Sequence, residues 1–367
     1  MSQVLRIGID ARELLGEATG VGRYLAELLV RWTARPDAVR RRLLLYTPER
    51  LALQLAPATV DERIVGAGSG RGTWWEQTHL RRAARQDPPD VFFAPAYTAP
   101  LGVRVPLAVT IHDISFVAHP EWFRAREGFR RRWLTRRAAR AASVVFTDSQ
   151  FSRSELEARL DVPPSRIVVI PPGVTDRRRG ADDRTARAPT VLFVGSLFNR
   201  RRLPDLIEAF AQATRDLPTA RLVLVGGDRT WPPQDLPAVA AAHGVLARTE
   251  FRHYATDEDL AILYSQASVF AFLSEYEGFG MTPLEALSAG VPPVVLDTAV
   301  AREVYGDAAL YVPRGDLDGT AATLRRLLVD PASAKPILAS AQAVLARYSW
   351  DEAAERTLEH IERIARR

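Results

Sequence analysis

Two glutamates, Glu277 and Glu285, stand eight positions apart in the stretch SEYEGFGMTPLEALSAGVPPV (274–294), with the glycine-flanked turn Gly278-Phe279-Gly280 between them. A glycine turn that runs into a helix leaves backbone N–H groups without partners, and the helix dipole adds positive potential at the same place. Such a turn is suited to binding an anion, and the two carboxylates flank it. Alternatively, Glu285 only caps the following helix and Glu277 is a solvated loop carboxylate.

The flanking residues predict the elements that position this stretch. The apolar run ASVFAFL (267–273) is typical of a buried parallel strand. Thr282, Pro283 and Glu285 match the N-cap, first and third positions of a helix. The GVP sequence at 290–292 predicts that this helix ends after about two turns.

The composition excludes several classes of protein. A chain of 367 residues is long enough for about two domains, and 47% hydrophobic with 25% charged residues is ordinary for a globular protein. The absence of cysteine excludes disulfides, thiolate catalysis and zinc–thiolate sites, and six histidines without an HxxxH spacing predict no structural metal site. No apolar run reaches the ~18 residues of a membrane span, and the first ten residues resemble a strand and not a signal peptide, so a cytoplasmic location is expected.

Charge is distributed unevenly along the chain. Lys335 is the only lysine, so the positive charge is almost entirely arginine. Residues 1–172 carry 26 arginines against 18 acidic residues, whereas residues 188–367 carry 18 basic against 23 acidic residues. A basic first half and an acidic second half suggest two domains that face different partners.

Short apolar runs alternate with helical patterns in the first half. Strands are predicted at 5–10, 43–46, 90–93, 107–111, 144–147 and 167–170, and helices at about 23–33 and 149–160. Repeated units of this kind indicate a parallel sheet covered on both faces. The strand at 107–111 delivers His112 at its carboxyl end, where open parallel sheets place ligand-contacting side chains. A histidine in such a place is also often only hydrogen-bonded to backbone.

The loop ARELLGEATGVG (11–22) carries the pair Gly20-x-Gly22 after the first strand. A dinucleotide-binding fold fits poorly, because the loop is long, no third glycine follows and no acidic residue clearly ends a second strand. Two interpretations remain, a glycine loop whose backbone approaches a ligand and a plain flexible turn.

The segment Arg124–Ala142 is rich in arginine and carries Phe129, Trp133 and Leu134 near one side at helical spacing. Such a helix could lie on anionic lipid or receive a phosphate-bearing acceptor. It could equally be a solvated face of an arginine-rich protein. No motif for reading nucleic acid accompanies it, so no nucleic-acid partner is expected.

A polar stretch, TDRRRGADDRTARAP (175–189), is typical of an interdomain linker, and the strand–helix pattern restarts after it. Strands are predicted at 190–194, 221–225, 249–251, 267–273, 294–296 and 310–312, with helices from about Pro204, at 257–267 and from Trp350 onward. The sequence therefore predicts two doubly wound domains, 1–174 and 190–349, with a cleft between them, followed by a C-terminal helix at 350–367.

The pairs Asp257/Asp259 and Asp316/Asp318 have a spacing that could bind a divalent metal in a sugar-transfer enzyme. Both pairs open predicted helices, where first-turn acids complement the helix dipole. Helix capping is therefore the preferred interpretation.

The motif E-G-F-G-x-x-x-x-E, bounded by Glu277 and Glu285, resembles the paired-glutamate motif of retaining glycosyltransferase family 4, whose members have the GT-B fold. The resemblance covers essentially the whole chain, through TGVGRY (19–24), WEQ (75–77), TIHD (110–113), HPE (119–121), SQFS (149–152), PPGV (171–174), Gly195-x-Leu197 with Arg200-Arg201, and YSW (348–350). Several of these motifs look like the branch of bacterial O-antigen mannosyltransferases. The implied architecture is two Rossmann-like domains facing across a cleft, with the C-terminal helix crossing back to pack on the first domain.

The resemblance implies a role for each matching residue and neither a cofactor nor a metal. Glu277 and His112 are expected at the donor sugar as catalytic residues, Glu285 at the donor ribose, and Arg200 with Arg201 at the diphosphate. Gly20 and Gly22 are expected to close on the phosphates from the other domain. The remaining donor-site candidates are Gly195, Ser196, Tyr254, Gly278, Phe279, Gly280, Met281 and Thr282.

Three departures from the family pattern bear on the donor. Arg202 stands where asparagine is common and is expected to add charge beside the diphosphate pair. Arg252-His253 replaces a common Leu-Gly ahead of Tyr254, where the family often seats the nucleobase, and Met281-Thr282 replaces a frequent Leu-Pro.

The expected function is transfer of a hexose, mannose from GDP-mannose by branch resemblance, to a saccharide or lipid-linked saccharide in glycan biosynthesis. The alternatives are a transferase or synthase that uses a UDP-sugar or another GDP-sugar on a small soluble acceptor, and a sugar-nucleotide-binding protein without enzymatic activity.

Overall fold

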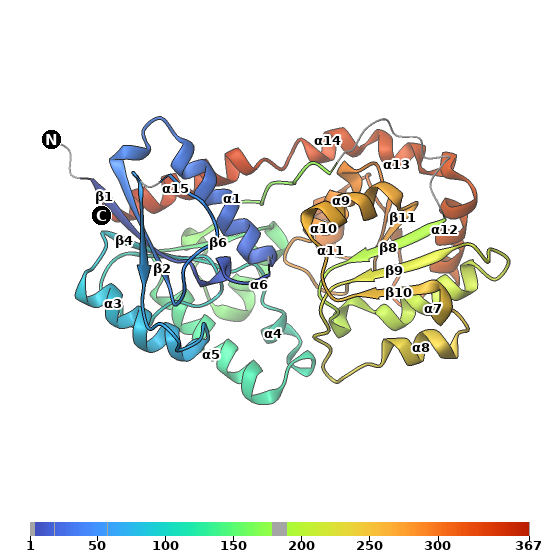
Figure 1. Ribbon diagram of the computed structural model, residues 1–367, viewed down its shortest axis with the longest axis horizontal. Coiled ribbons are helices and arrows are strands. Elements are labelled where there is room, and N and C mark those ends of the chain that lie inside the picture. The colour runs from blue at the N-terminus through green and yellow to red at the C-terminus, as the bar shows by residue number, and fades with distance from the viewer. Residues whose placement is uncertain (1–3, 18, 57, 178–188, 367) are drawn as a thin grey trace. The chain divides into compact units, whose positions relative to one another are not determined.

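The computed structural model describes residues 4–17, 19–56, 58–177 and 189–366, and it divides into two compact units, each built on a parallel sheet with helices packed against it (Figure 1). The first unit comprises Met1–Ala118, Arg126–Gly173 and Ser349–Arg367. The second unit comprises His119–Ala125 and Val174–Tyr348. Both units are Rossmann-like, which confirms the predicted fold class.

The sheet of the first unit has seven parallel strands in the order β3-β2-β1-β4-β5-β6-β7. Its central strands are buried apolar runs, as both faces of a parallel sheet require. The strands are β1 (Leu5–Asp10), β2 (Arg41–Thr47), β3 (Val60–Ile64), β4 (Val91–Ala94), β5 (Leu107–Thr110), β6 (Val144–Thr147) and β7 (Ile167–Val169).

The helices of the first unit follow the predicted alternation. The helix predicted at 149–160 begins one residue later, at Gln150, and the helix predicted at about 23–33 begins three residues earlier, at Gly20. The C-terminal helix begins at Trp350, as predicted. They are α1 (Gly20–Ala34), α2 (Thr73–Trp75), α3 (Arg81–Gln86), α4 (Ser115–Ala118), α5 (Ala125–Ala141), α6 (Gln150–Leu160) and α15 (Trp350–Ala365).

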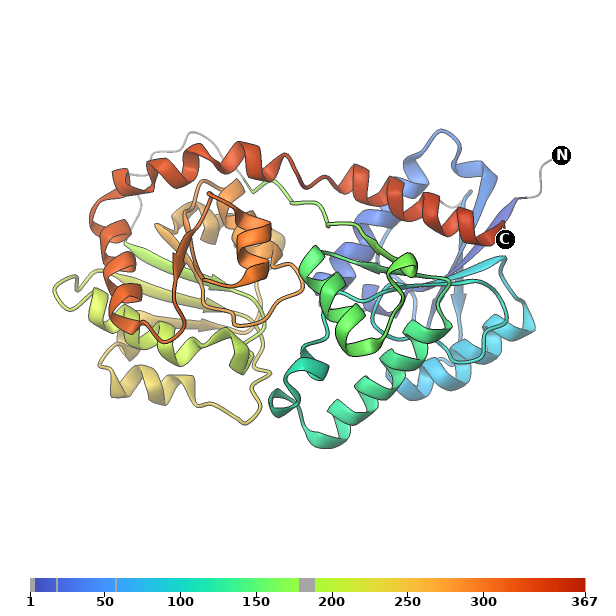
Figure 2. The ribbon, with the colours of Figure 1, turned by 180° about the vertical axis from the view of Figure 1, so that it is seen from behind.

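Helix α15 belongs to the first unit although it is the last element of the chain, and it packs on α1, β4 and β6 (Figure 2). Its buried face is an apolar stripe at helical spacing that ends with Leu358, Ile361 and Ile364. Trp32 of α1 donates an indole hydrogen bond of 2.8 Å to the carbonyl oxygen of Ala354.

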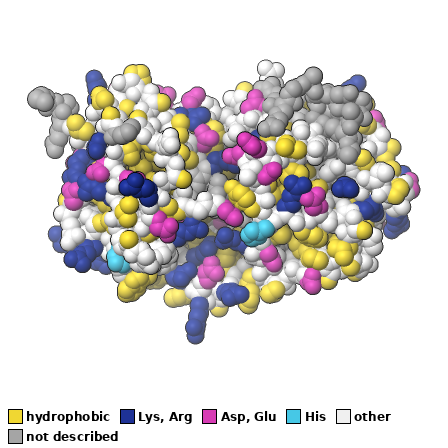
Figure 3. Space-filling view, in the orientation of Figure 1, with side chains coloured by type: hydrophobic (Ala, Val, Ile, Leu, Met, Phe, Trp, Pro, Cys, Tyr) yellow, Lys and Arg dark blue, Asp and Glu magenta, His cyan; other side chains and the backbone are white. Residues whose placement is uncertain are grey.

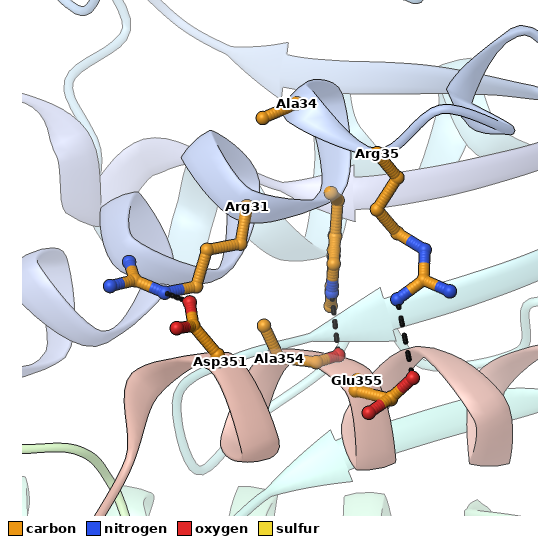
Figure 4. Close-up of a pocket in the computed structure, with 7 residues that line it drawn as sticks. Arg31, Ala34, Arg35, Asp351, Ala354 and Glu355 are labelled. Atoms are coloured by element: carbon orange, nitrogen blue, oxygen red, sulfur yellow. Dashed lines mark hydrogen bonds and ion pairs between the residues drawn. The ribbon is translucent and has the colours of Figure 1, made fainter.

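Two ion pairs flank the Trp32 hydrogen bond. Arg31 lies 2.6 Å from Asp351, and Arg35 lies 3.6 Å from Glu355. All four side chains line a pocket of about 260 Å³ between α1 and α15, where Figure 4 shows the two guanidiniums reaching toward the two carboxylates. The pairs are half-exposed, so each adds little stability, and the apolar stripe supplies most of it.

The sheet of the second unit has six parallel strands in the order β10-β9-β8-β11-β12-β13. The strands are β8 (Thr190–Val194), β9 (Arg221–Val225), β10 (Thr249–Arg252), β11 (Val269–Phe272), β12 (Pro293–Leu296) and β13 (Leu310–Val312). The helices are α7 (Leu203–Ala213), α8 (Leu236–Ala242), α9 (Asp257–Gln266), α10 (Met281–Ser288), α11 (Ala299–Tyr305), α12 (Leu317–Val329), α13 (Lys335–Ala339) and α14 (Ala341–Leu345).

The predicted linker, 175–189, lies mostly outside the described residues, because 178–188 are not among them. A short segment of the first half of the chain, His119–Ala125, belongs to the second unit. There the His119 ring stacks on Trp122 at 4.0 Å and meets the Tyr276 ring edge-on at 5.5 Å. No helix in the described part of the chain is long and apolar enough to cross a membrane.

Candidate donor-binding site

The stretch around the two glutamates has the predicted strand–turn–helix order, but the helix begins earlier than predicted. Helix α10 starts at Met281, its N-cap is Gly280 in the left-handed conformation, and no side chain caps it. Thr282 is therefore inside the first turn, and the prediction that it is the N-cap is wrong. Glu285 is the fifth helical residue and does not reach back to the helix start.

Glu277 lies in the turn after β11 with two arginines and one serine around its carboxylate. The Nε of Arg201 is 3.1 Å from Oε1 of Glu277, and the Nε of Arg200 is 3.5 Å from the same oxygen. Ser274 donates a 2.5 Å hydrogen bond to Oε1. All three charged side chains are buried, so Glu277 is not a solvated loop carboxylate.

The arginine pair is held by the short 3₁₀ turn that follows β8, Asn199–Arg201. Each guanidinium also lies over an aromatic ring, Arg200 over Phe198 at 4.5 Å and Arg201 over Phe272 at 4.3 Å. Two guanidiniums face one carboxylate in a buried setting, where electrostatic interactions are strong.

Glu285 is buried on α10 and meets two side chains from other segments. Tyr264 of α9 lies 3.2 Å from Oε2 of Glu285, and Arg177 lies 3.6 Å from Oε1. A buried carboxylate needs such partners, because an uncompensated charge in the interior is strongly unfavourable. The alternative interpretation, that Glu285 only caps the helix, does not agree with these contacts.

The glycine turn before α10 is closed by Tyr305 of α11. Its hydroxyl donates a 2.9 Å hydrogen bond to the carbonyl oxygen of Gly280. Burial raises the pKa of Tyr305 well above its ordinary value, and Glu277 raises it further, so the hydroxyl remains a donor. Gly280 has φ +89°, and a Cβ there would lie 2.2 Å from the Tyr305 hydroxyl oxygen, so this position requires glycine.

The first-turn N–H groups of α10 follow this turn and have no intrahelical partners, as at the start of any α-helix. These N–H groups belong to α10, the helix that carries Glu285, and they come a few residues after Glu277 in the sequence. The second unit thus brings together a buried guanidinium pair, a helix N-terminus and two carboxylates. This combination can bind an anion and, beside it, hydroxyl groups or a developing positive charge.

The other predicted donor-site residues of the second unit lie at the carboxyl ends of neighbouring strands. Gly195 and Ser196 follow β8, and the Gly195 N–H donates 2.9 Å to the Val225 carbonyl of β9. Tyr254 follows β10 and is 43% exposed. The ring of His253, the unusual residue before it, packs close to Gly227 at the end of β9.

Arg202 does not act as a third free charge beside the arginine pair. It has left-handed backbone, pairs with Asp205 at 2.5 Å and also contacts Glu275. Arg314 lies 3.1 Å from the same Glu275 carboxylate. The prediction that Arg202 adds charge beside the pair is therefore wrong, since its charge is neutralised locally.

Both Asp-x-Asp pairs are at helix starts. Thr256 and Asp259 form a capping box at the start of α9. Asp316 is the N-cap of α12 and accepts from the Gly319 N–H at 2.9 Å. The capping interpretation is confirmed for both helix starts. Among the described residues, no group of three or more His, Asp or Glu side chains is placed to hold a metal.

In the first unit, Gly20 and Gly22 are in the first turn of α1 and not in a loop. Thr19 is the N-cap and accepts a 3.0 Å hydrogen bond from the Gly22 N–H. A Cβ on Gly22 would lie 2.4 Å from the Glu13 carbonyl oxygen, so close backbone approach explains this glycine. The prediction of a helix beginning near Arg23 was three residues late, and a flexible turn is excluded.

His112 follows β5 and has a partner for each ring nitrogen. Nδ1 lies 2.9 Å from the Asp148 carboxylate, and Nε2 lies 3.0 Å from the Pro95 carbonyl oxygen. Asp148 follows β6, the neighbouring strand. Burial disfavours the imidazolium, but the Asp148 carboxylate, the Pro95 carbonyl oxygen and the Asp113 carboxylate together outweigh burial and raise the pKa of His112.

Family models match most of the chain. Residues 18–178 match the model described as Glycosyltransferase Family 4, and residues 176–343 match the model described as Glycosyl transferases group 1. The chain thus carries a Glycosyltransferase Family 4 domain followed by a Glycosyl transferases group 1 domain. This confirms the family that the paired-glutamate motif indicated.

Two relatives of this glycosyltransferase are mannosyltransferases by name. It is 28% identical over 260 residues to O-antigen chain mannosyltransferase B of Escherichia coli, and this alignment covers 68% of each chain. It is also 28% identical over 221 residues to GDP-mannose:cellobiosyl-diphosphopolyprenol alpha-mannosyltransferase of Xanthomonas campestris, covering 59% of this chain and 57% of the relative.

A solved structure supports the fold. WaaG, a glycosyltransferase involved in lipopolysaccharide biosynthesis, superposes with a TM-score of 0.77 at 18% identity, covering 97% of this chain and 99% of WaaG. The predicted GT-B fold is confirmed. The roles predicted for individual site residues concern a bound donor and remain predictions.

The sequence did not predict several residues that contact the candidate site residues in the structure. They are Asp148, Arg177, Tyr264, Ser274 and Tyr305. Asp148 had a signal, since it follows a buried strand as His112 does. Arg177 and Tyr264 had none, because only the folded chain brings them to Glu285.

Proposed function

We propose that this glycosyltransferase transfers mannose, with retention of configuration, from GDP-mannose to a saccharide or lipid-linked saccharide in surface polysaccharide biosynthesis. The observation that carries the proposal is the arginine pair around Glu277, beside the start of the helix that bears Glu285. The names of the two relatives support mannose as the sugar, and the second relative supports GDP as the carrier.

Each part of the site has a task in this reaction. Negative charge develops on the departing nucleoside diphosphate, and in this reaction Arg200, Arg201 and the N–H groups at the start of α10 stabilise that charge. Glu277 supplies a carboxylate for the positively charged sugar ring that develops as the bond breaks. Glu285 accepts hydrogen bonds from the donor ribose. The two guanidiniums take the place that a divalent cation has in other transferases, so we propose that no metal is needed.

The proposal is tested with the purified protein and a panel of nucleotide sugars. GDP-mannose should raise the melting temperature more than UDP-glucose or GDP-glucose, because a ligand that binds only the folded state stabilises it. Transfer to a membrane lipid extract should continue in EDTA, and NMR of the product should show the retained anomer. Stronger stabilisation by a UDP-sugar, with transfer to a water-soluble sugar, would establish the alternative donor and acceptor instead.

The role of Glu285 is tested by Glu285→Gln, which keeps the shape and removes the charge. Donor KM should rise and turnover should fall by at least about tenfold, the effect of losing one charged hydrogen bond. Unchanged kinetics with GDP-mannose would remove Glu285 from the site.

We also propose that α5 touches the cytoplasmic surface of an anionic membrane. Phe129 and Trp133 lie one turn apart and are 66% and 46% exposed. Exposed arginines of α5 surround them. Basic side chains, drawn in dark blue, are also spread over the face of the protein that Figure 3 shows. Arg137 lies over the Trp133 ring at 5.3 Å. Exposed aromatics within a basic face are typical of helices that lie on a membrane.

Vesicle sedimentation tests this contact. Wild type should sediment with vesicles that contain phosphatidylglycerol and not with pure phosphatidylcholine, and reversing Arg130, Arg131 and Arg137 to Glu should abolish binding. Reversing Arg153 and Arg159 on α6 is the control, since these surface arginines, the first of them partly buried, have no exposed aromatic residue in the adjacent turns of α6. If wild type does not sediment, α5 is a solvated face.

A further inference from the structure

Arg177 lies in a stretch of sequence that looks like a polar linker, yet its side chain is buried in the second unit. One of its terminal nitrogens, Nη2, faces two carboxylates at once. It is 2.8 Å from Oδ1 of Asp257 at the start of α9 and 3.6 Å from Oε1 of Glu285 on α10. Arg177 thus links the helix start of α9 to the carboxylate predicted to bind the donor ribose.

The backbone of this segment is fixed to the same helix. The Arg177 N–H donates a 3.1 Å hydrogen bond to the Ser288 hydroxyl at the end of α10. The Ser288 hydroxyl in turn donates to the carbonyl oxygens of Glu285 and Thr175, at 2.8 Å and 3.3 Å. The backbone of this segment is therefore anchored to α10, which keeps the base of the Arg177 side chain near Glu285.

The two oxygens of Glu285 are therefore approached by different groups. Oε1 faces the Arg177 guanidinium and Oε2 accepts from the Tyr264 hydroxyl. Tyr264 and Asp257 are both on α9, so this helix and Arg177 form one supporting surface behind the carboxylate. A carboxylate that must meet two ribose hydroxyls gains from being fixed in advance, since no ordering is then left for the binding step.

We propose that Arg177 is a positioning residue that holds the Glu285 carboxylate in the orientation required by the donor ribose. This inference rests on the proposed function, because it assumes that Glu285 binds the ribose. Arg177 acts through Glu285 and does not itself touch the donor. Its removal should therefore weaken binding only of ligands that carry ribose hydroxyls.

Calorimetric titration with GDP, UDP and 2′,3′-dideoxy-GDP tests the inference. Arg177→Gln should weaken GDP binding about tenfold and leave dideoxy-GDP binding within about twofold of wild type. In a double-mutant cycle, adding Arg177→Gln to Glu285→Gln should cause no further loss, because the two residues act on one contact. Arg177→Lys, which keeps the charge without the planar fork, should recover part of the affinity.

Arg325→Gln is the matched control. It removes an arginine that pairs with Asp216 in the same unit and should leave GDP binding unchanged. If Arg177→Gln does not fold, the same titrations are made with Arg177→Lys and Tyr264→Phe. These variants should also lose more affinity for GDP than for dideoxy-GDP.

The outcomes separate the inference from the proposed function. If wild type binds neither GDP nor UDP, both are overturned. If Glu285→Gln weakens GDP binding and Arg177→Gln does not, the inference alone is overturned. An equal loss of GDP and dideoxy-GDP affinity in Arg177→Gln would make the residue merely structural and would also overturn it.

Discussion

The Nδ1 of His112 lies 2.9 Å from the carboxylate of Asp148, while its Nε2 lies 3.0 Å from a backbone carbonyl oxygen. Both partners are acceptors, so both contacts are satisfied only when both ring nitrogens carry hydrogen. The geometry therefore favours the imidazolium at the carboxyl edge of the first sheet. A histidine held in this way offers positive charge and cannot act as a proton acceptor.

The first prediction concerns pH. In the unfolded chain His112 titrates near its ordinary pKa of about 6.5, and in the folded chain its pKa is raised. The stabilisation is therefore fully present below about pH 6.5 and is lost as the pH rises through the folded pKa. Asp148→Asn should lower the pKa of His112 and remove this part of the pH dependence. NMR titration of His112 and urea denaturation across the pH range measure both effects, and an unchanged His112 titration in the variant would contradict them.

A second prediction concerns Asp10, which is buried at the end of β1. Its Oδ2 lies 3.2 Å from Arg12, which is also 2.6 Å from Glu76, so one guanidinium serves two carboxylates. Burial raises the pKa of Asp10 to about 7, with Arg12 opposing and Glu76 reinforcing the rise. For this group the folded pKa exceeds the unfolded one, so its contribution to stability is lost as the pH rises from about 4 to about 7.

Asp10→Asn removes this titration and keeps an acceptor for the Arg12 N–H, which Asp10 binds at 3.3 Å. The stability of the variant relative to wild type should therefore increase between pH 4 and pH 7. Urea denaturation at pH 4, 6 and 8 measures the difference. A difference that is constant with pH would show that folding does not shift the pKa of Asp10.

A third prediction concerns Glu277. Glu277→Gln leaves two buried guanidiniums without their shared carboxylate, which should lower the free energy of unfolding by about 3 kcal/mol. Turnover should fall by about 10²–10³ if the carboxylate stabilises the transition state. Glu275→Gln is the matched control, because Glu275 also contacts two arginines, Arg202 and Arg314. It should lose stability and keep turnover, and equal kinetic losses in both variants would argue against a specific role for Glu277.

The last prediction concerns the turn at Gly280. In Gly280→Ala the left-handed backbone should lower the free energy of unfolding by about 1–2 kcal/mol. The new Cβ also displaces the Tyr305 hydroxyl, which should lower the free energy of unfolding further. Donor affinity should fall as the start of α10 shifts. Gly315→Ala, also at positive φ but with nothing within 4 Å of its Cβ, carries the backbone cost alone. Denaturation and GDP titration of both variants separate the two effects.

Parallel strands were the most predictable elements. The bounds of β6 and β8 are those predicted, because a strand covered on both faces is a largely apolar run. The bounds of β9 and β13 are also those predicted, although β9 begins with an exposed arginine and β13 is a partly buried edge strand. β3 was missed, since Val60–Ile64 is an edge strand with charged residues in its middle and only partial burial. Helix starts were less predictable. Helix α1 begins at Gly20, directly after its N-cap Thr19, and α10 begins after Gly280, whose left-handed backbone starts the helix without a capping side chain.

The sequence by itself determined the two Rossmann-like units, the family and the stretch that carries Glu277 and Glu285, because apolar periodicity and a spaced motif are local properties. The surroundings of those glutamates were decided only by the tertiary structure. Arg200 and Arg201 reach Glu277 from 76 or more positions away, and Arg177 reaches Glu285 across 108 positions of chain. Burial made these contacts necessary, since a carboxylate removed from water must find a cation, and only the fold determines which arginine is near enough.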